Sequence, residues 1–207
     1  DDQLEKMLRA GAGSYLLKDL LVIDGLKQAS VMEKLLQLLA LQVGQEVSYH
    51  ELGKALGISY KTVEKYLGLL VQAFIVFPLP GFSRNLRKEI TKNKCWYFWD
   101  NGIRNALLGQ FQPMNLRQDG GQLWENYFIS ERMKWCSYHR PLARHYFWRT
   151  YDQQELDLVE EENGQLRAFE LKWNPQAKAR VPKAFANAYP TAEYQLVHLQ
   201  NYWQWLE

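Results

Sequence analysis

The 207-residue sequence predicts an α+β protein, with a helical N-terminal half and a C-terminal half that alternates helices and strands. Three observations indicate this class. Apolar residues recur at helical spacing through VMEKLLQLLALQ, and two further helical patterns separated by a glycine follow. Later, Asn163-Gly164 joins two runs that read as strands. The predicted order after residue 112 is αβββαβ.

The first 43 residues are expected to form a helical connector, because apolar residues repeat at helical spacing and Gly44 then ends the run. The chain begins DDQLEK without an initiator methionine, so we expect it to be part of something longer. GAGSYLLK and ELGKALG both fail the GxxxxGK[ST] pattern, so any ATP is expected to bind to an upstream module.

Residues 44–111 fit a winged helix-turn-helix. Gly57 lies where the turn between the helices requires positive φ, and Gly53 is small where they cross. Ser59 is placed to cap the second helix. FIVFPLPGF and CWYFW are expected to be the strands of a wing that carries the basic segment SRNLRKEITKNK.

Two groups of side chains are predicted to contact nucleic acid, one on the exposed face of the second helix and one in the wing. They are Tyr60, Lys61 and Lys65 on the helix, together with Arg84, Arg87 and Lys88 in the wing. A winged helix used only as a packing module, with its cations solvated, is an equal alternative.

Asp100 is placed to cap a short helix that ends near Gly109, and QPMNLRQDGG then reads as a linker. The second domain is expected to span residues 112–207. Its predicted helices lie at QLWENYFISERM and VPKAFANAYP. Its predicted strands are HYFWRT, LDLVEE, LRAFELKW and YQLVHL, of which the first three form an antiparallel meander.

The Asn163-Gly164 turn sets the register of a hairpin, because a type I′ turn needs positive φ at both central residues. Counting outward places Asp157 opposite Glu170 and Glu155 opposite Lys172. Cross-strand Cβ atoms lie roughly 4.5–5.5 Å apart, so the two carboxylates need solvent, a shared proton or a cation between them. A bulge in either strand would shift this pairing. The alternative is a solvated face with one Glu155–Lys172 surface pair.

The composition of the chain limits the compartment and the kind of partner that we expect. No apolar run reaches the length of a membrane helix and no signal peptide is visible, so we expect a cytoplasmic protein without a membrane partner. Cys95 and Cys136 match no paired motif and are expected to be reduced thiols. The acids concentrate in residues 155–162, apart from the basic segment, which suggests two different tasks.

The pattern of Asp157, twelve residues, then Glu170-x-Lys172, preceded by a helix bearing Glu125, resembles the PD-(D/E)XK nuclease superfamily. The proline of that name is absent, since Leu156 precedes Asp157. With KDLLVIDG, FWDNGIRNAL, LWENYF and FWRT in order, the chain resembles the C-terminal region of a family of prokaryotic AAA-type ATPases catalogued as a domain of unknown function. There, an ATPase module precedes a winged helix and a nuclease-like domain.

The resemblance implies a phosphodiesterase that acts on DNA. Asp157 and Glu170 would hold Mg²⁺ or Mn²⁺, Glu125 would support the site through water, and Lys172 would orient water and stabilise phosphoryl charge. Glu155 would hold Lys172 in position. The alternative is a regulatory module that binds nucleic acid or protein for the attached ATPase without hydrolysis.

Overall fold

The computed structural model describes residues 29–83 and 94–207, which form a mixed α+β protein with six α-helices and two sheets among those residues. The chain divides into two compact units. Of the described residues, the first unit holds 29–78 and 96–117, and the second holds 79–83, 94–95 and 118–207. The candidate site residues Glu125, Asp157, Glu170 and Lys172 all lie in the second unit.

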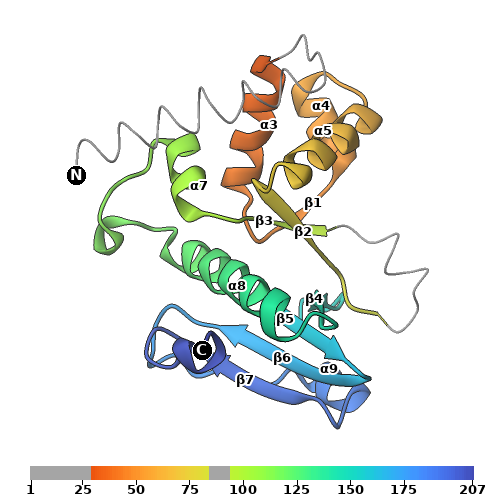
Figure 1. Cartoon of the computed structure of the whole chain (residues 1–207), viewed down its shortest axis with the longest axis vertical. Helices are drawn as coiled ribbons and strands as arrows, with labels where there is room; N and C mark the ends of the chain where they lie inside the picture. The colour runs from red at the N-terminus through yellow and green to blue at the C-terminus, as the bar shows by residue number, and fades with distance from the viewer. Residues whose placement is uncertain (1–28, 84–93) are drawn as a thin grey trace. The chain divides into compact units, whose positions relative to one another are not determined.

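The first unit consists of helices gathered around a small sheet (Figure 1). Its sheet has the strand order β1-β3-β2. Leu35, Leu39 and Leu70 are fully buried, as the helical periodicity of the sequence requires. The elements are α3 (Ala29–Leu41), β1 (Glu46–Val47), α4 (Tyr49–Leu56), α5 (Tyr60–Gln72), β2 (Val76–Pro80), β3 (Lys94–Phe98) and α7 (Asn101–Leu108).

The tight turn between α4 and α5 confirms the glycine and capping predictions. Gly57 has a φ of 69°, in the left-handed region. A Cβ on Gly53 would lie 2.7 Å from the carbonyl oxygen of Ile58, so only glycine permits this approach. The Ser59 hydroxyl accepts a hydrogen bond from the Thr62 amide at 3.1 Å. Asp100 caps α7 in the same way, through the amides of Gly102 and Ile103.

The predicted wing contacts Arg84, Arg87 and Lys88 lie outside the described residues, as does most of the connector over residues 1–28. The strands on either side of the wing segment are present as β2 and β3. The end of β2 belongs to the second unit, because Gly81 pairs with Phe147 and the Phe82 amide donates to the Phe147 carbonyl at 2.7 Å. The assignment of the residues after β2 to the second unit was not predicted from the sequence.

The second unit is a four-stranded sheet of order β4-β5-β6-β7 with helices on both faces (Figure 1). The meander is antiparallel and β7 runs parallel to β6. Phe128 of α8 packs on Phe169, and Phe185 of α9 packs on Trp148. The elements are α8 (Gly120–His139), β4 (Arg144–Arg149), β5 (Glu155–Glu162), β6 (Gln165–Leu171), α9 (Lys183–Ala188) and β7 (Glu193–Val197). The predicted αβββαβ order is confirmed.

The hairpin turn also forms as predicted, with φ of 51° at Asn163 and 78° at Gly164. The counted register holds from Glu162–Gln165 to Leu158–Phe169. The recorded β5–β6 pairs end there, and on the other side of β5 the β4–β5 register shifts between Tyr146 and Trp148, opposite the stretch that contains Asp157. The expected direct pairing of Asp157 with Glu170 is absent from the β5–β6 ladder, and the Leu171 amide donates to the Asp157 carboxylate instead.

The side chains beside Asp157 do not alternate regularly between the two faces of the sheet. Leu156 and Val159 belong to one buried cluster with Ala168 and Phe185, although regular alternation would place them on opposite faces. Leu158 is not a member of this cluster, although it lies two residues from Leu156 along the strand. The bulged strand redirects the side chains beside Asp157.

Two further observations bear on the sequence expectations. Cys95 and Cys136 are both buried free thiols, as predicted. Within residues 29–83 and 94–207, no helix combines the length and apolar character needed to cross a membrane.

Candidate functional site

Asp157 lies at the irregular end of the β5–β6 hairpin. Its Oδ2 accepts a hydrogen bond from the Leu171 amide at 2.6 Å, so the carboxyl takes the place of a main-chain acceptor. Burial raises the pKa of Asp157 well above its ordinary range, and the charges of Glu125 and Glu170 raise it further. The Leu171 amide and the Lys172 charge oppose this effect without cancelling it. The site therefore favours a proton or a cation at Asp157.

Glu170 and Lys172 meet at the end of β6. The Lys172 Nζ lies 2.5 Å from the Glu170 Oε1, and the Lys172 amide donates to the Val197 carbonyl of β7. Burial lowers the pKa of Lys172, but its hydrogen bond with Glu170 and the charges of Glu170, Asp157 and Glu155 outweigh that effect and raise the pKa. The Lys172 ammonium group is therefore charged and held by Glu170, with its side chain 38% exposed.

Glu125 comes from α8, one turn before Phe128, and its charge acts on Asp157. Three carboxylates from three elements thus influence one another, which is the donor chemistry that Mg²⁺ and Mn²⁺ prefer. Within the part of the chain that the structure describes, these three carboxylates do not form a close three-ligand group. The ligand pair of Asp157 and Glu170, with Glu125 in support, stays a prediction, and of the two glutamates Glu125 has the larger effect on the pKa of Asp157.

The role predicted for Glu155 requires correction. Glu155 forms an ion pair with Arg149 of β4, whose Nη2 lies 2.6 Å from the Glu155 Oε2. Because Lys172 lies beyond the end of β6, the regular pairing that would bring Glu155 opposite it does not form. Glu170 holds Lys172 instead, and Glu155 contributes only its charge.

Tyr194 is a site residue that sequence reasoning missed. It lies on β7, paired with Ala168 of β6, and its hydroxyl is buried without a hydrogen-bond partner among the described residues. Burial and the charges of Glu170 and Asp157 raise its pKa to about 12. A neutral hydroxyl is therefore held as a donor near the two carboxylates. The parallel placement of β7 beside β6 positions it, and no local motif indicates that placement.

In the first unit, the predicted nucleic-acid contacts Lys61 and Lys65 are exposed at the start of α5, and Tyr60 is 42% exposed. Tyr60 packs on His50 of α4, with ring centroids 4.9 Å apart. These side chains share the solvent-facing side of the helix, as the sequence pattern predicts. They remain predicted contacts, since a solvated surface has the same geometry.

A second group of possible metal ligands lies elsewhere in the second unit. Within the described residues, Cys136, His145 and Glu160 place one ligand atom each within 4.8 Å of one another. Glu160 is already held by Arg132 at 2.7 and 3.0 Å and by Arg140 at 3.0 Å. Burial and Glu160 raise the pKa of Cys136 to about 12, so the thiol stays protonated. Two guanidiniums and a protonated thiol disfavour a cation there.

This cluster also corrects the expected acidic patch over residues 155–162. Glu160 is only 1% exposed, and burial raises its pKa while Arg132, His145 and Arg140 lower it by a larger amount. Glu162 pairs with Arg140 at 2.7 Å. Glu160 and Glu162 are therefore engaged in ion pairs and do not form a free acidic surface.

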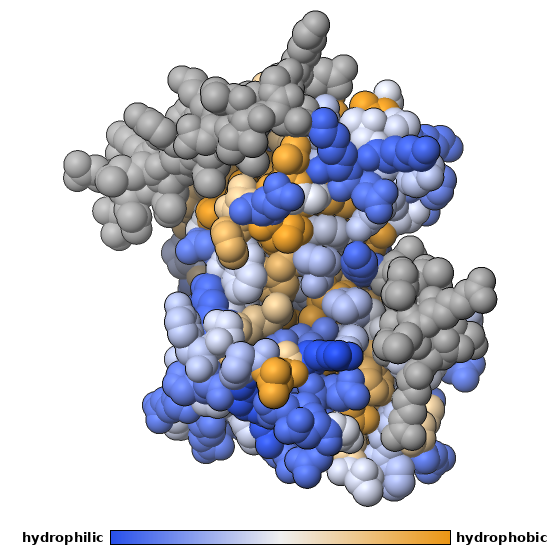
Figure 2. Space-filling view, turned by 45° about the vertical axis from the view of Figure 1, so that its right-hand side comes forward, coloured by the Kyte–Doolittle hydropathy of each residue, from blue (hydrophilic) through white to orange (hydrophobic). Residues whose placement is uncertain are grey.

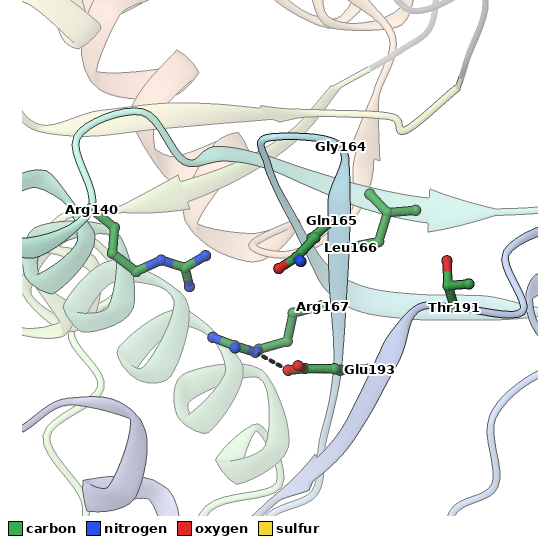
Figure 3. Close-up of a pocket in the computed structure, with 7 residues that line it drawn as sticks. All are labelled: Arg140, Gly164, Gln165, Leu166, Arg167, Thr191 and Glu193. Carbon is green, nitrogen blue, oxygen red and sulfur yellow. Dashed lines mark hydrogen bonds and ion pairs between the residues drawn. The ribbon is translucent and has the colours of Figure 1, made fainter.

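A hollow lies beside the turn of the hairpin, at the opposite end of the two strands from Asp157. Figure 3 shows the guanidiniums of Arg140 and Arg167 extending toward the same space, with Glu193 paired to Arg167 at 2.7 Å. Both arginines already have carboxylate partners. The hollow therefore offers no unneutralised charge for a ligand, and the Asp157 site remains the candidate.

Comparison with known proteins places the two halves of the chain in separate domain families. Residues 1–113 match a domain of unknown function, DUF8612, and residues 120–202 match a second domain of unknown function, DUF4143. A crystal structure of a Vibrio cholerae protein aligns with 96% of this chain and 47% of its own, at 14% identity and a TM-score of 0.27. That score is too low to carry an argument.

Three uncharacterised bacterial proteins are similar in sequence. Those of Mycobacterium tuberculosis and Mycobacterium bovis are each 30% identical over 161 residues, which is 77% of this chain and 36% of theirs. One from Haemophilus influenzae is 26% identical over 116 residues, or 53% of this chain and 29% of its own. This chain spans about a third of these relatives. Because DUF8612 covers more than half of the residues, the chain belongs to the DUF8612 family.

Proposed function

We propose that the second unit is a metal-dependent phosphodiesterase of the PD-(D/E)XK type that acts on DNA. The observation that carries the proposal is the raised pKa of Asp157, produced by burial beside Glu125 and Glu170 at a point where β5 is distorted. Strand irregularities are over-represented beside active sites, and strongly perturbed pKa values cluster at functional sites. The lysine two residues after Glu170 supplies the remaining residue type that the chemistry needs.

In this mechanism Asp157 and Glu170 would hold Mg²⁺ or Mn²⁺, and Glu125 would support the site through water. When bound, the ion would supply positive charge to stabilise the phosphoryl oxygens and to acidify water. Lys172 would leave its contact with Glu170 to orient the attacking water and stabilise developing phosphoryl charge. The Tyr194 hydroxyl would donate a hydrogen bond to a substrate or water oxygen.

The first unit is proposed to contribute nucleic-acid or partner binding. Its two helices joined by the Gly57 turn, with Lys61 and Lys65 exposed on the second, support a winged helix. The DUF4143 match supports an association with AAA-type ATPases, since such domains occur in ATPase-associated proteins. We propose that an ATPase module precedes this region in the whole protein.

Cleavage by the purified chain tests the phosphodiesterase directly. Labelled single-stranded and duplex DNA are incubated with Mn²⁺, Mg²⁺, Ca²⁺ or a chelator. Replacing Lys172 with alanine should reduce the Mn²⁺-dependent rate about 10²–10³-fold, because one electrostatic stabiliser of the transition state is lost. Lys178→Ala is the matched control, since Lys178 is an exposed lysine of the same unit.

A second reading is a regulatory module that binds without cleaving. The close Lys172–Glu170 pair favours it, because both side chains are engaged with each other. Metal-independent DNA binding that weakens steeply with salt, with no cleavage in any of the metals, would establish this alternative. Equal rates for Lys172→Ala and the unaltered protein would exclude the proposed catalytic role of Lys172.

A further inference from the structure

A contiguous group of aromatic rings lies beside the candidate site in the second unit. Trp124 of α8 contacts Trp173 at 6.4 Å and Tyr202 at 5.4 Å between ring centroids. Tyr202 in turn contacts Tyr127 at 6.0 Å and Trp203 at 5.8 Å. We call this group the aromatic platform; its members are Trp124, Tyr127, Trp173, Tyr202 and Trp203.

The platform combines a buried base with exposed outer rings. Trp124 is only 3% exposed, whereas Tyr127 and Trp173 are each 38% exposed and Trp203 is 43% exposed. The buried Trp124 ring contacts Tyr127, Trp173 and Tyr202, and Tyr202 in turn contacts Trp203. Hydrophilic colours predominate over the lower part of the face that Figure 2 shows. Rings held in place and left partly exposed are suited to stacking against a flat ligand.

The platform adjoins the proposed catalytic residues through the chain itself. Trp124 directly precedes Glu125, and Trp173 directly follows Lys172. The Trp124–Trp173 contact brings the start of α8 and the end of β6 together, and Glu125 and Lys172 on these two segments both act electrostatically on Asp157. The platform therefore extends the acidic site rather than forming a remote patch.

We propose that the aromatic platform stacks the unpaired bases of a single-stranded nucleic acid whose phosphodiester backbone passes the Asp157 site. This inference rests on the proposed function. Aromatic rings bind bases of any sequence because every base has a π-face, and they need that face to be free. A continuous duplex keeps its base faces stacked internally, so single strands or unpaired ends fit the surface and duplex interiors do not.

The charge of the site adds a second requirement. Glu125, Asp157 and Glu170 repel a phosphate backbone, and Lys172 is engaged with Glu170. Binding of a single strand across this end should therefore strengthen when a divalent cation offsets the carboxylates. The two requirements, free base faces and a divalent cation, distinguish this surface from a general basic patch, which binds without added metal.

Fluorescence anisotropy of a labelled twelve-nucleotide oligothymidine, in Ca²⁺ and in chelator, tests the proposal. The variant with both Trp173→Ala and Trp203→Ala should bind in Ca²⁺ at least about 30-fold more weakly, since each stacked base contributes about 1–3 kcal/mol. Trp173→Phe should retain most of the affinity. Tyr138→Ala is the matched control, because Tyr138 is an 84% exposed aromatic of α8 that does not belong to the platform. Circular dichroism confirms that each variant folds.

Three results would overturn the platform: unchanged affinity in the double variant, equal competition by blunt duplex of the same sequence, or loss of self-association in the double variant without an effect on DNA. The last would identify a second copy of the chain as the occupant. Cleavage distinguishes this inference from the proposed function. Oligothymidine binding that depends on Trp173 and Trp203, without any cleavage, would support the platform and exclude the phosphodiesterase. Cleavage that is unchanged by replacing both tryptophans would support the phosphodiesterase and exclude the platform.

Discussion

Asp157→Asn is expected to abolish metal-dependent cleavage and, at the same time, to stabilise the folded protein. The variant removes a carboxylate that is buried beside Glu125 and Glu170, and asparagine retains an oxygen to accept the Leu171 amide. Stabilising changes of this kind contribute about 0.5–2 kcal/mol, or on the order of 2–4 °C in melting temperature per kcal/mol. A gain in stability together with a loss of activity identifies a residue kept for chemistry.

The pH dependence of this stabilisation has a defined sign. The pKa of Asp157 is raised in the folded state, and in the unfolded chain it is about 3.9. Between these values the folded state binds more protons than the unfolded state, so the stability of the unaltered protein falls as pH rises. The advantage of Asp157→Asn should therefore grow above about pH 4 and vanish below it. Thermal melts across pH measure the effect, and an advantage largest in acid would contradict it.

Arg132→Met is expected to destabilise the second unit by about 3–5 kcal/mol, because it leaves the buried Glu160 carboxylate without its principal partner. Arg132 is 1% exposed, donates twice to Glu160 and donates to the Trp205 carbonyl, and it packs over Trp135 at 4.4 Å. Methionine is similar in volume, so the loss reflects mainly charge and hydrogen bonding.

The control for Arg132 lies two residues further along α8. Lys134 pairs with Glu131 at 2.7 Å on the surface, and Lys134→Met should cost less than about 1 kcal/mol. Urea denaturation followed by tryptophan fluorescence reports mainly on the second unit, since six of the eight tryptophans lie there. Combining Arg132→Met with Glu160→Leu should recover part of the loss, because the unpaired charge is removed. A single-variant loss below 1 kcal/mol would show that Arg140 alone satisfies Glu160.

The predictions that succeeded rest on local chemistry. Asn163-Gly164 determined the hairpin and the register of its inner half, and Ser59, Gly57 and Asp100 marked helix ends through capping and positive φ. Each of these features depends on residues within a few positions of one another. A single sequence carries that information directly.

The predictions that failed depend on distant packing. The irregularity beside Asp157 lies in the register with β4, and in that register Glu155 is the direct partner of Arg149. Glu160 appears in the sequence as one of a run of acids, yet Arg132, 28 residues earlier, buries it in an ion pair. Tyr194 joins the site only because β7 lies parallel to β6. Nothing within a short window of sequence indicates these partners.

The central claim is that the carboxylates around Asp157 bind a divalent cation, and Mn²⁺ binding followed by electron paramagnetic resonance tests it most directly. The unaltered chain should remove about one equivalent of Mn²⁺ from solution, with higher affinity at higher pH as Asp157 loses its proton. Asp157→Asn should weaken binding at least 10-fold, the lower end of the loss that accompanies a change around a metal site. Asp152→Asn, in the exposed loop before β5, should bind Mn²⁺ as the unaltered protein does. Equal Mn²⁺ binding by the unaltered protein and Asp157→Asn would contradict the account.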